Sequence, residues 1–250
     1  MSRRVANLGC GPKASSHPDV INIDWSIYLR FRSSALFKWL PPLLLRGERL
    51  RRYRSLPANI VAHDLARGIP LPADSVDVVY HSHMLEHIDR NRVAAFQAEV
   101  LRVLKPGGVQ RIVVPDLELL ARRYLASLSA VRAERLVRQR HDDSVAELLE
   151  QSVRRDAAAA HPLRGWRRSI YTRVFGDARR RGETHQWMYD AENLSALLES
   201  CGFGDVAVVA FDRSRIPGWG AYGLDVDESG RQYKPDSLYI EAVKPREAAR

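Results

Sequence analysis

Short apolar runs alternate with longer polar or amphipathic segments along the chain. The runs are rich in β-branched residues, are too short for helices, and end at a glycine or a polar residue, which is typical of buried strands. Seven strands are therefore predicted, at residues 4–9, 19–24, 59–65, 75–83, 109–115, 205–211 and 237–243.

Two of the intervening segments show helical periodicity. Residues 91–104 repeat their apolar positions at a period of about 3.6 residues, and the "KPGG" that follows predicts a turn that ends the helix. Residues 190–203 form a second amphipathic pattern, in which Asp190 can cap the first turn and Gly202 can end the helix.

Strands that alternate with helices, followed by two late strands joined without a helix, predict an α/β fold. We expect a Rossmann-like three-layer sandwich with a seven-stranded, mostly parallel sheet and an antiparallel last strand. The length of 250 residues suits one domain, residues 1–250, with insertions at residues 25–58 and 117–182. In such sheets ligands bind at the carboxyl ends of the strands, so the functional residues are expected there.

The composition is that of a globular protein, with 45% apolar and 28% charged residues. No run of about 18 apolar residues occurs, which argues against a transmembrane helix. The N-terminus enters the first strand with no apolar signal region, and Cys10 and Cys201 are too few for a disulfide framework. We therefore expect a cytoplasmic location.

Much of the net charge of +9 lies in the insertions. Residues 25–58 carry eight basic residues against one acidic residue, interleaved with aromatic and aliphatic side chains. This pattern suits a lid over the substrate, a contact in a homodimer, or an amphipathic element on the inner, anionic face of a membrane. Residues 117–182 are also rich in arginine and are expected to form a helical wall on the substrate side.

The first predicted strand ends in the glycine loop "NLGCGPKA", and the second ends in an acid, Asp24. Glycine lets the backbone turn tightly and approach a ligand, and a carboxylate accepts hydrogen bonds from a ribose diol. Taken alone, this pair fits an NAD-binding Rossmann protein as well as other nucleotide-binding proteins.

The order of the motifs resembles that of the class I S-adenosylmethionine-dependent methyltransferases. "NLGCGP" is similar to their first motif, "NID" to their ribose-binding segment, "AHDL" and "HSHMLEHI" to their third and fourth segments, and "EVLRVLKPGGVQRIVVPD" to their fifth. The resemblance covers roughly residues 4–116 and 190–243. It departs at Pro12 and Lys13, where many members carry another glycine.

The resemblance implies S-adenosylmethionine as cofactor and a set of residues around it. Asp24 would bind the ribose diol with Trp25 beside it, Asp64 would accept from the adenine amino group, and His81 with Ser82 would line the methionine or ribose side. The implied cofactor-binding residues are Asn7, Gly9, Cys10, Gly11, Asp24, Trp25, His63, Asp64, Leu65, His81 and Ser82.

The segment "HSHMLEHI" also spells H-x-x-E-H, which is the pattern of one class of zinc peptidase. That site needs both histidines on a helix, whereas His83 directly follows a predicted strand, so no metal ligand is assigned. A divalent metal such as Mg²⁺ remains compatible with the sequence, but no spacing demands it. If the acceptor is a hydroxyl, a base must take its proton. The candidate bases are His87, His83, His185 and Asp116.

Three hypotheses are left open: a methyltransferase for a saccharide or another small molecule, a methyltransferase for RNA or another anionic polymer, and a non-enzymatic or NAD-binding Rossmann-like protein. Residues 184–203, with "SRIPGW" and "SLYIEAVKP", resemble bacterial methyltransferases that act on saccharides, which implies a hydroxyl of a sugar or of an oligo- or polysaccharide precursor, such as a methylated mannose polymer. Trp166, Trp187 or Trp219 could stack on a sugar ring. RNA is the alternative suggested by the pI of 9.9, although no Asn/Asp-Pro-Pro-aromatic segment follows the fourth strand. A non-methylating NAD-binding protein is the third.

Overall fold

A single seven-stranded sheet organises the chain. The computed structural model describes residues 3–25, 29, 32, 46–54, 57–133, 138–151 and 185–246. The strands are β1 (Val5–Leu8), β2 (Val20–Asp24), β3 (Ile60–Ala62), β4 (Val76–Ser82), β5 (Leu104–Pro115), β6 (Gly204–Val209) and β7 (Ser237–Val243). Their order is β3-β2-β1-β4-β5-β7-β6, and β7 runs antiparallel to both of its neighbours. The predicted mostly parallel sheet with an antiparallel last strand is confirmed.

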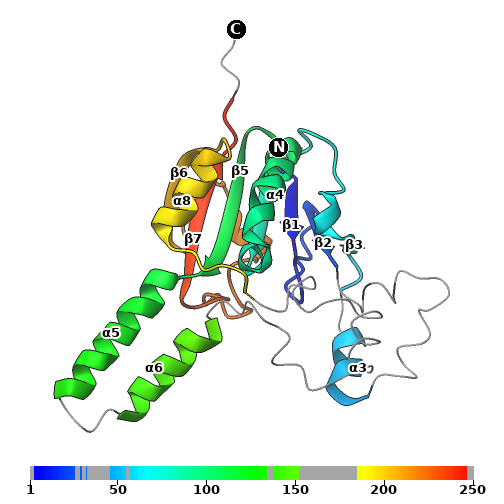
Figure 1. Ribbon diagram of the computed structural model, residues 1–250. Coiled ribbons are helices and arrows are strands. Elements are labelled where there is room, and N and C mark those ends of the chain that lie inside the picture. The colour runs from blue at the N-terminus through cyan, green and yellow to red at the C-terminus, as the bar shows by residue number, and fades with distance from the viewer. Residues whose placement is uncertain are drawn as a thin grey trace, which may run out of the picture.

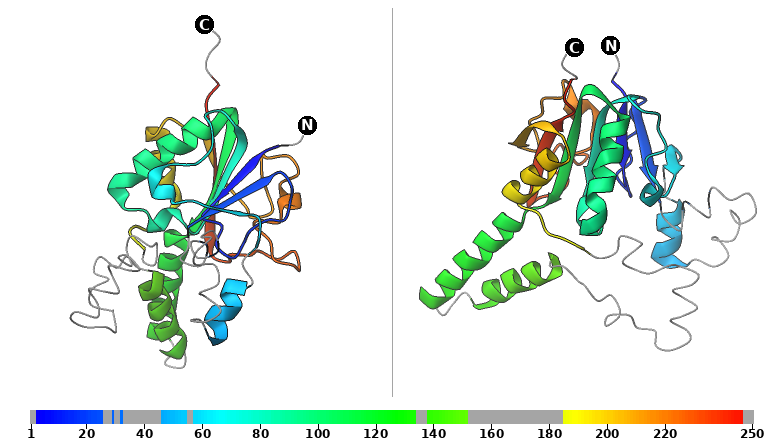
Figure 2. Two further views of the ribbon diagram at one scale, coloured as in Figure 1. Left: turned by 90° about the vertical axis from the view of Figure 1, so that its right-hand side faces the viewer. Right: turned by 45° about the horizontal axis from the view of Figure 1, so that its top comes forward.

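Helices α4 and α8 cover one face of this sheet (Figures 1 and 2). Buried side chains of α4 (Arg90–Val103), among them Phe96 and Val100, pack with buried leucines of α8 (Ala191–Ser200) in one apolar cluster. The capping box of α8 begins at Asp190, whose carboxylate accepts the N–H of Asn193 at 2.8 Å, as predicted. Both predicted helices are thus present.

The other face is covered, within the described residues, by the segment between β6 and β7 rather than by a helical layer (Figure 2). Its short 3-10 helix η4 (Trp219–Tyr222) packs on Tyr80 and on neighbouring apolar side chains of the sheet. A buried arginine on β5, Arg111, holds this segment: it donates to Asp225 and to Glu241, each at 2.7 Å. It also donates to the backbone oxygens of residues 210, 211 and 213.

The "KPGG" segment, residues 105–108, belongs to β5 and is not a turn between helix and strand, which corrects the prediction. The physical reason is tertiary: Gly107 donates to the backbone oxygen of Lys244 and Lys244 donates to that of Gly108, each at 2.9 Å. The chain that leaves β7 therefore gives these residues strand-like partners.

The two insertions are described only in part. Helix α3 (Gly47–Arg54) lies within residues 25–58, and the remainder of that insertion, apart from its two ends and positions 29, 32 and 46, lies outside the described residues. In the second insertion, α5 (Leu117–Ala133) and α6 (Arg138–Gln151) lie side by side and project from the edge where β5 ends (Figure 1). Residues 134–137 and 152–182, including Trp166, lie outside the described part. Among the described helices, none is long and apolar enough to cross a bilayer.

Candidate active site

The carboxyl ends of β1, β2, β3 and β4 meet at one edge of the sheet, because these strands are parallel and paired. The register places Leu8 beside both Ile23 and His81, so the glycine loop, Asp24 and Ser82 follow at the same level. The predicted cofactor residues are therefore brought to one edge.

The glycine loop needs glycine at both of its positions. Gly9 has φ +62°, and a β-carbon there would lie 2.8 Å from the Cγ and Sδ atoms of Met84. Gly11 has φ +50°, and a β-carbon there would have no atom within 4 Å. The backbone is therefore packed on one side and open on the other, which is the arrangement a ligand approaching the main chain requires.

The buried side chains of Asn7 and Cys10 support the glycine loop from the protein interior. The Asn7 amide, 1% exposed, donates to the backbone oxygen of Lys13 and to the Asn22 side chain. Cys10 is buried, and burial raises the pKa of its thiol to about 12, so it stays neutral. Their side chains lie in the protein interior, and their effect on a cofactor is through the shape of the loop.

Asp24 lies half-buried at the end of β2. Its Oδ1 atom accepts the N–H of Trp25 at 2.6 Å. Burial raises the pKa of Asp24, while hydrogen bonds from the backbone of Trp25 and Gly11 act in the opposite direction. The adjacent Trp25 is 42% exposed, so a large flat ring stands beside the carboxylate. A carboxylate and an exposed aromatic ring next to an open glycine fit the ribose and adenine of S-adenosylmethionine.

The end of β3 carries the other predicted adenine-side residues. Asp64 accepts the N–H of Ala66 at 3.1 Å and caps the 3-10 helix η1 (Leu65–Arg67). His63 is joined to the backbone oxygen of Gly68 through Nε2 at 3.1 Å. Contact of Asp64, His63 and Leu65 with the adenine stays a prediction.

His81 occupies a different place from the one predicted. Its side chain is fully buried, pairs with the Gln110 amide at 3.0 Å, and packs edge-on against Phe96 of α4. Burial lowers the pKa of His81 to about 3. The ring therefore belongs to the core between the sheet and α4, and Ser82, the next residue, is the one at the sheet edge.

Three of the four candidate bases gather beyond the end of β4, around a fourth side chain, Glu86. His83 follows the strand with φ +50°, and His87 lies in the 3-10 helix η2 (Leu85–His87). The rings of His87 and His185 have centroids 4.8 Å apart. Glu86 Oε1 lies 3.6 Å from His83 Nδ1 and 4.0 Å from His87 Nε2. The structure therefore brings these three histidines together around Glu86.

Glu86 was not among the predicted site residues. Its side chain has no solvent exposure, and both carboxylate oxygens lack a hydrogen-bond donor within the described part of the chain. Burial raises the pKa of Glu86 to about 8. The position of the acid between two histidines was the available signal. The N–H of Gln186 donates to the Glu86 backbone oxygen at 2.6 Å, so the chain that leads into α8 runs beside this residue.

His83 and Asp116 are engaged with other groups. His83 Nε2 lies 2.8 Å from Ser237 Oγ, and burial lowers the pKa of His83 to about 3. The Asp116 carboxylate accepts the N–H of Leu119 at 3.1 Å in the first turn of α5. Trp219, 6% exposed, donates to Asp225 at 2.6 Å and lies in the core on the far face.

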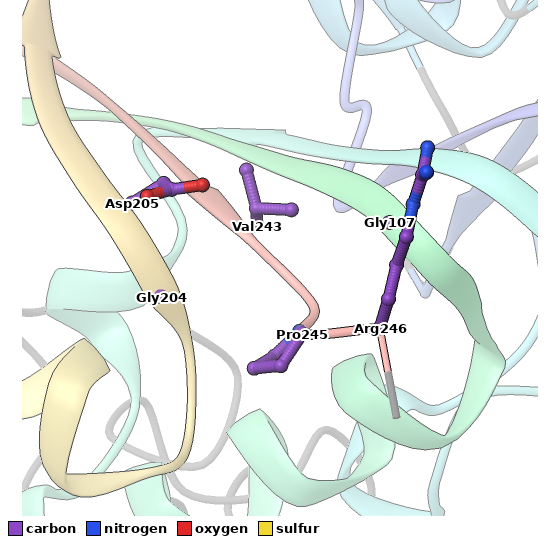
Figure 3. Close-up of a pocket in the computed structure, with 6 residues that line it drawn as sticks. All are labelled: Gly107, Gly204, Asp205, Val243, Pro245 and Arg246. Atoms are coloured by element: carbon purple, nitrogen blue, oxygen red, sulfur yellow. The ribbon is translucent and has the colours of Figure 1, made fainter. Parts of the chain in front are cut away.

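Another hollow lies at the opposite edge of the sheet, where β5 and β6 begin and β7 ends (Figure 3). It is lined by Gly107, Gly204, Asp205, Val243, Pro245 and Arg246. None of the predicted site residues lines it, and parallel α/β sheets bind ligands at the other edge.

The comparison with protein families decides the class of enzyme. A family model described as a methyltransferase domain matches residues 44–112, the stretch that contains β3, β4, Glu86 and α4. The chain is an S-adenosylmethionine-dependent methyltransferase. S-Adenosylmethionine is its methyl donor, and the alternative of an NAD-binding protein is set aside. The antiparallel β7 between β5 and β6 distinguishes this sheet from the dinucleotide-binding order.

Solved structures of similar fold come from several organisms. A methyltransferase from Archaeoglobus fulgidus is 17% identical, with a TM-score of 0.43, 98% of this chain and 87% of that chain covered. One from Methanosarcina mazei is 18% identical, with a TM-score of 0.45 and coverage of 98% and 94%. A possible histamine N-methyltransferase from Thermotoga maritima is 15% identical, with a TM-score of 0.44 and coverage of 98% and 83%. No curated protein matches the methyltransferase.

Proposed function

We propose that the methyltransferase transfers its methyl group to a hydroxyl oxygen of a sugar or of an oligo- or polysaccharide precursor. The observation that carries this proposal is the cluster of His83, Glu86, His87 and His185 at the edge where the cofactor residues lie. We infer that Gly9, Gly11, Asp24 and Trp25 hold the cofactor and that the cluster acts on the acceptor.

A hydroxyl acceptor explains why such a cluster is needed. The methyl group leaves a sulfonium sulfur, so the departing thioether is neutral and needs no acid. An alcohol, in contrast, is hardly ionised at neutral pH and must lose its proton as the new O–CH₃ bond forms.

The proton and the electrons balance within this scheme. The acceptor oxygen attacks the methyl carbon, the C–S bond breaks with its electron pair remaining on sulfur, and S-adenosylhomocysteine is released. Since the pKa of His83 is lowered and the carboxylate of Asp116 caps α5, activation of the hydroxyl falls to Glu86, His87 and His185. Holding donor and acceptor in line supplies the remaining catalysis.

The saccharide class is supported by the aromatic residues around the site and by the resemblance of residues 184–203. Trp187 lies next to the cluster, two residues after His185, and its backbone N–H donates to the Glu86 backbone oxygen. A flat apolar ring presents a surface to the C–H groups of a sugar. One face of Trp187 is taken by the Arg90 guanidinium, 3.8 Å from the ring centroid, so a sugar would pack on the other face of this ring.

A transfer screen tests this proposal. Purified protein is incubated with S-adenosylmethionine labelled in the methyl group and with separate pools of mannose-type oligosaccharides, other oligosaccharides and total RNA. We expect acid- and alkali-stable label in a saccharide pool, as an ether would give. Label in RNA alone, or methyl transfer to amines alone, would contradict the proposal.

A further inference from the structure

We propose that Glu86, His87 and His185 bind one divalent transition-metal ion that activates the acceptor hydroxyl, an inference that rests on the proposed function. The three residues come from two segments, η2 after β4 and the chain that leads into α8. One ligand atom from each lies within 4.8 Å of the other two.

The scaffold of this site is fixed by the backbone. The N–H groups of Gln186 and Trp187 both donate to the Glu86 backbone oxygen, at 2.6 and 3.3 Å. His185 is therefore held beside His87 by its neighbours' main-chain bonds. Donors bound to one ion at about 2.1 Å lie roughly 3 to 4 Å apart. The 4.0 Å between Glu86 Oε1 and His87 Nε2 already falls in that range, so small side-chain rotations bring the three atoms to binding distance.

The environment of the Glu86 carboxylate independently supports a bound cation. It has no solvent exposure and both of its oxygens lack a donor in the described structure. A buried carboxylate without hydrogen bonds is strongly destabilising, and such groups are found paired or bound to metal ions. A cation among Glu86, His87 and His185 supplies the partner that the described residues do not.

The donor set selects the kind of ion. Two imidazole nitrogens and one carboxylate oxygen suit borderline ions such as Mn²⁺, Fe²⁺, Co²⁺ and Zn²⁺, whereas Mg²⁺ prefers oxygen ligands alone. Three protein ligands leave coordination positions open, as catalytic metal sites do. An acceptor hydroxyl bound at an open position loses its proton to solvent more readily, because the ion stabilises the alkoxide.

His83 has a positioning role beside this site. Its Nδ1 atom lies 3.6 Å from Glu86 Oε1, and Ser237 Oγ lies 2.8 Å from its Nε2. Groups of this kind orient the carboxylate that binds the metal, and their loss weakens metal affinity by about 10- to 100-fold.

Metal binding is tested directly with Co²⁺ and Mn²⁺ on the chelator-treated full chain. Co²⁺ is followed by its visible absorption bands and Mn²⁺ by calorimetry, in the wild type, in Glu86→Gln and in His185→Gln. His17→Gln, just before β2 begins, where the ring packs against Tyr222, serves as the matched control. We expect one ion per chain, a loss of at least about 100-fold in affinity for both ligand variants, and no change for the control. Wild-type protein that binds neither ion, or binding unaffected in both variants, overturns the site.

Methyl transfer measured in the same samples separates the two proposals. Transfer to a saccharide that persists in chelator, with no metal bound, overturns the metal site and leaves the proposed function standing. One bound ion lost in both variants, together with methyl transfer only to non-hydroxyl acceptors, overturns the proposed function and leaves the metal site standing. Should Glu86→Gln fail to fold, His185→Gln carries the test, because the His185 side chain is partly exposed.

Discussion

Glu86 Oε1 lies 3.6 Å from His83 Nδ1, on a carboxylate that has no access to solvent. The ring is in turn held at Nε2 by Ser237 on β7, so two distant parts of the sheet define where the Glu86 carboxylate lies. Such an arrangement is costly for folding, since a buried acid must stay protonated or find a cation. A buried acid that reduces stability and lies beside the cofactor-binding edge of the sheet indicates a functional role for Glu86.

Glu86→Gln should therefore separate stability from activity. The amide keeps the shape and removes the buried charge, so we expect the free energy of unfolding at pH 8 to be unchanged or to rise by about 1 kcal/mol. Methyl transfer should fall by about 100-fold or more. Urea unfolding and the transfer assay measure the two effects.

Glu99→Gln is the matched control for this substitution. Glu99 accepts two hydrogen bonds from Arg102, at 2.7 and 2.8 Å, and one from the N–H of Ile69. Its loss should reduce stability by about 1 kcal/mol with little effect on transfer. A strongly destabilised Glu86→Gln that keeps full activity would contradict this account of Glu86.

The glycine loop makes a second prediction. Gly9→Ala adds a β-carbon at φ +62° and against Met84, whereas Gly11→Ala at φ +50° meets no atom. Each should lose about 1–2 kcal/mol from the backbone strain. The Met84→Ala change should recover part of the loss in Gly9→Ala and nothing in Gly11→Ala, as thermal unfolding of the double variants would show. Equal effects of Met84→Ala on both would be inconsistent with the packing of Gly9.

The third prediction concerns Arg111, the buried arginine on β5. Arg111→Met leaves Asp225, which is 4% exposed, without its cation, and leaves Glu241, which is 0% exposed, with Arg215 alone. We expect a loss of about 3–5 kcal/mol in the free energy of unfolding. Arg122→Met is the control, because its ion pair with Glu118 is exposed and should be worth less than about 1 kcal/mol. Similar losses for both variants would rule out this role for Arg111.

The fourth prediction concerns acid stability. Burial lowers the pKa of His81 from 6.5 to about 3, so the unfolded chain binds a proton that the folded chain does not. The stability that this group contributes is present above pH 6.5 and is lost as the pH falls toward 3. His81→Gln should reduce the fall in stability between pH 6 and 4 by up to about 1.4 kcal/mol per pH unit. If the free energy of unfolding falls equally with pH in the variant and in the wild type, His81 does not contribute to acid sensitivity.

The sheet and the helices α4 and α8 follow from local signals. Their strands are short β-branched runs, and Asp190 caps α8 through a contact three residues away. The "KPGG" segment was misread because its partner is Lys244, at the other end of the chain. Sequence patterns report neighbours well and distant strand partners poorly.

In the site as well, features that depend on nearby residues were predicted and features that depend on distant residues were not. His83 and His87 were predicted because they follow the fourth predicted strand beside the expected position of the methyl group, and His185 because it could reach the same cleft. Glu86 was not predicted as a site residue because His185 and Gln186, which lie beside it, are about 100 positions away in the sequence. The ion pairs of Arg111 were missed for the same reason, since Asp225 and Glu241 lie 114 and 130 residues further along.

The most direct test of the site is the affinity of S-adenosylmethionine for the wild type and for Asp24→Asn, measured by calorimetry. We expect one cofactor bound per chain and a loss of about 10- to 100-fold in the variant, because charge-assisted hydrogen bonds contribute about 1.5–3 kcal/mol. Asp212→Asn, an exposed acid on the far loop, should bind as the wild type does. Unchanged affinity in Asp24→Asn would contradict the placement of the cofactor at the ends of β1 and β2.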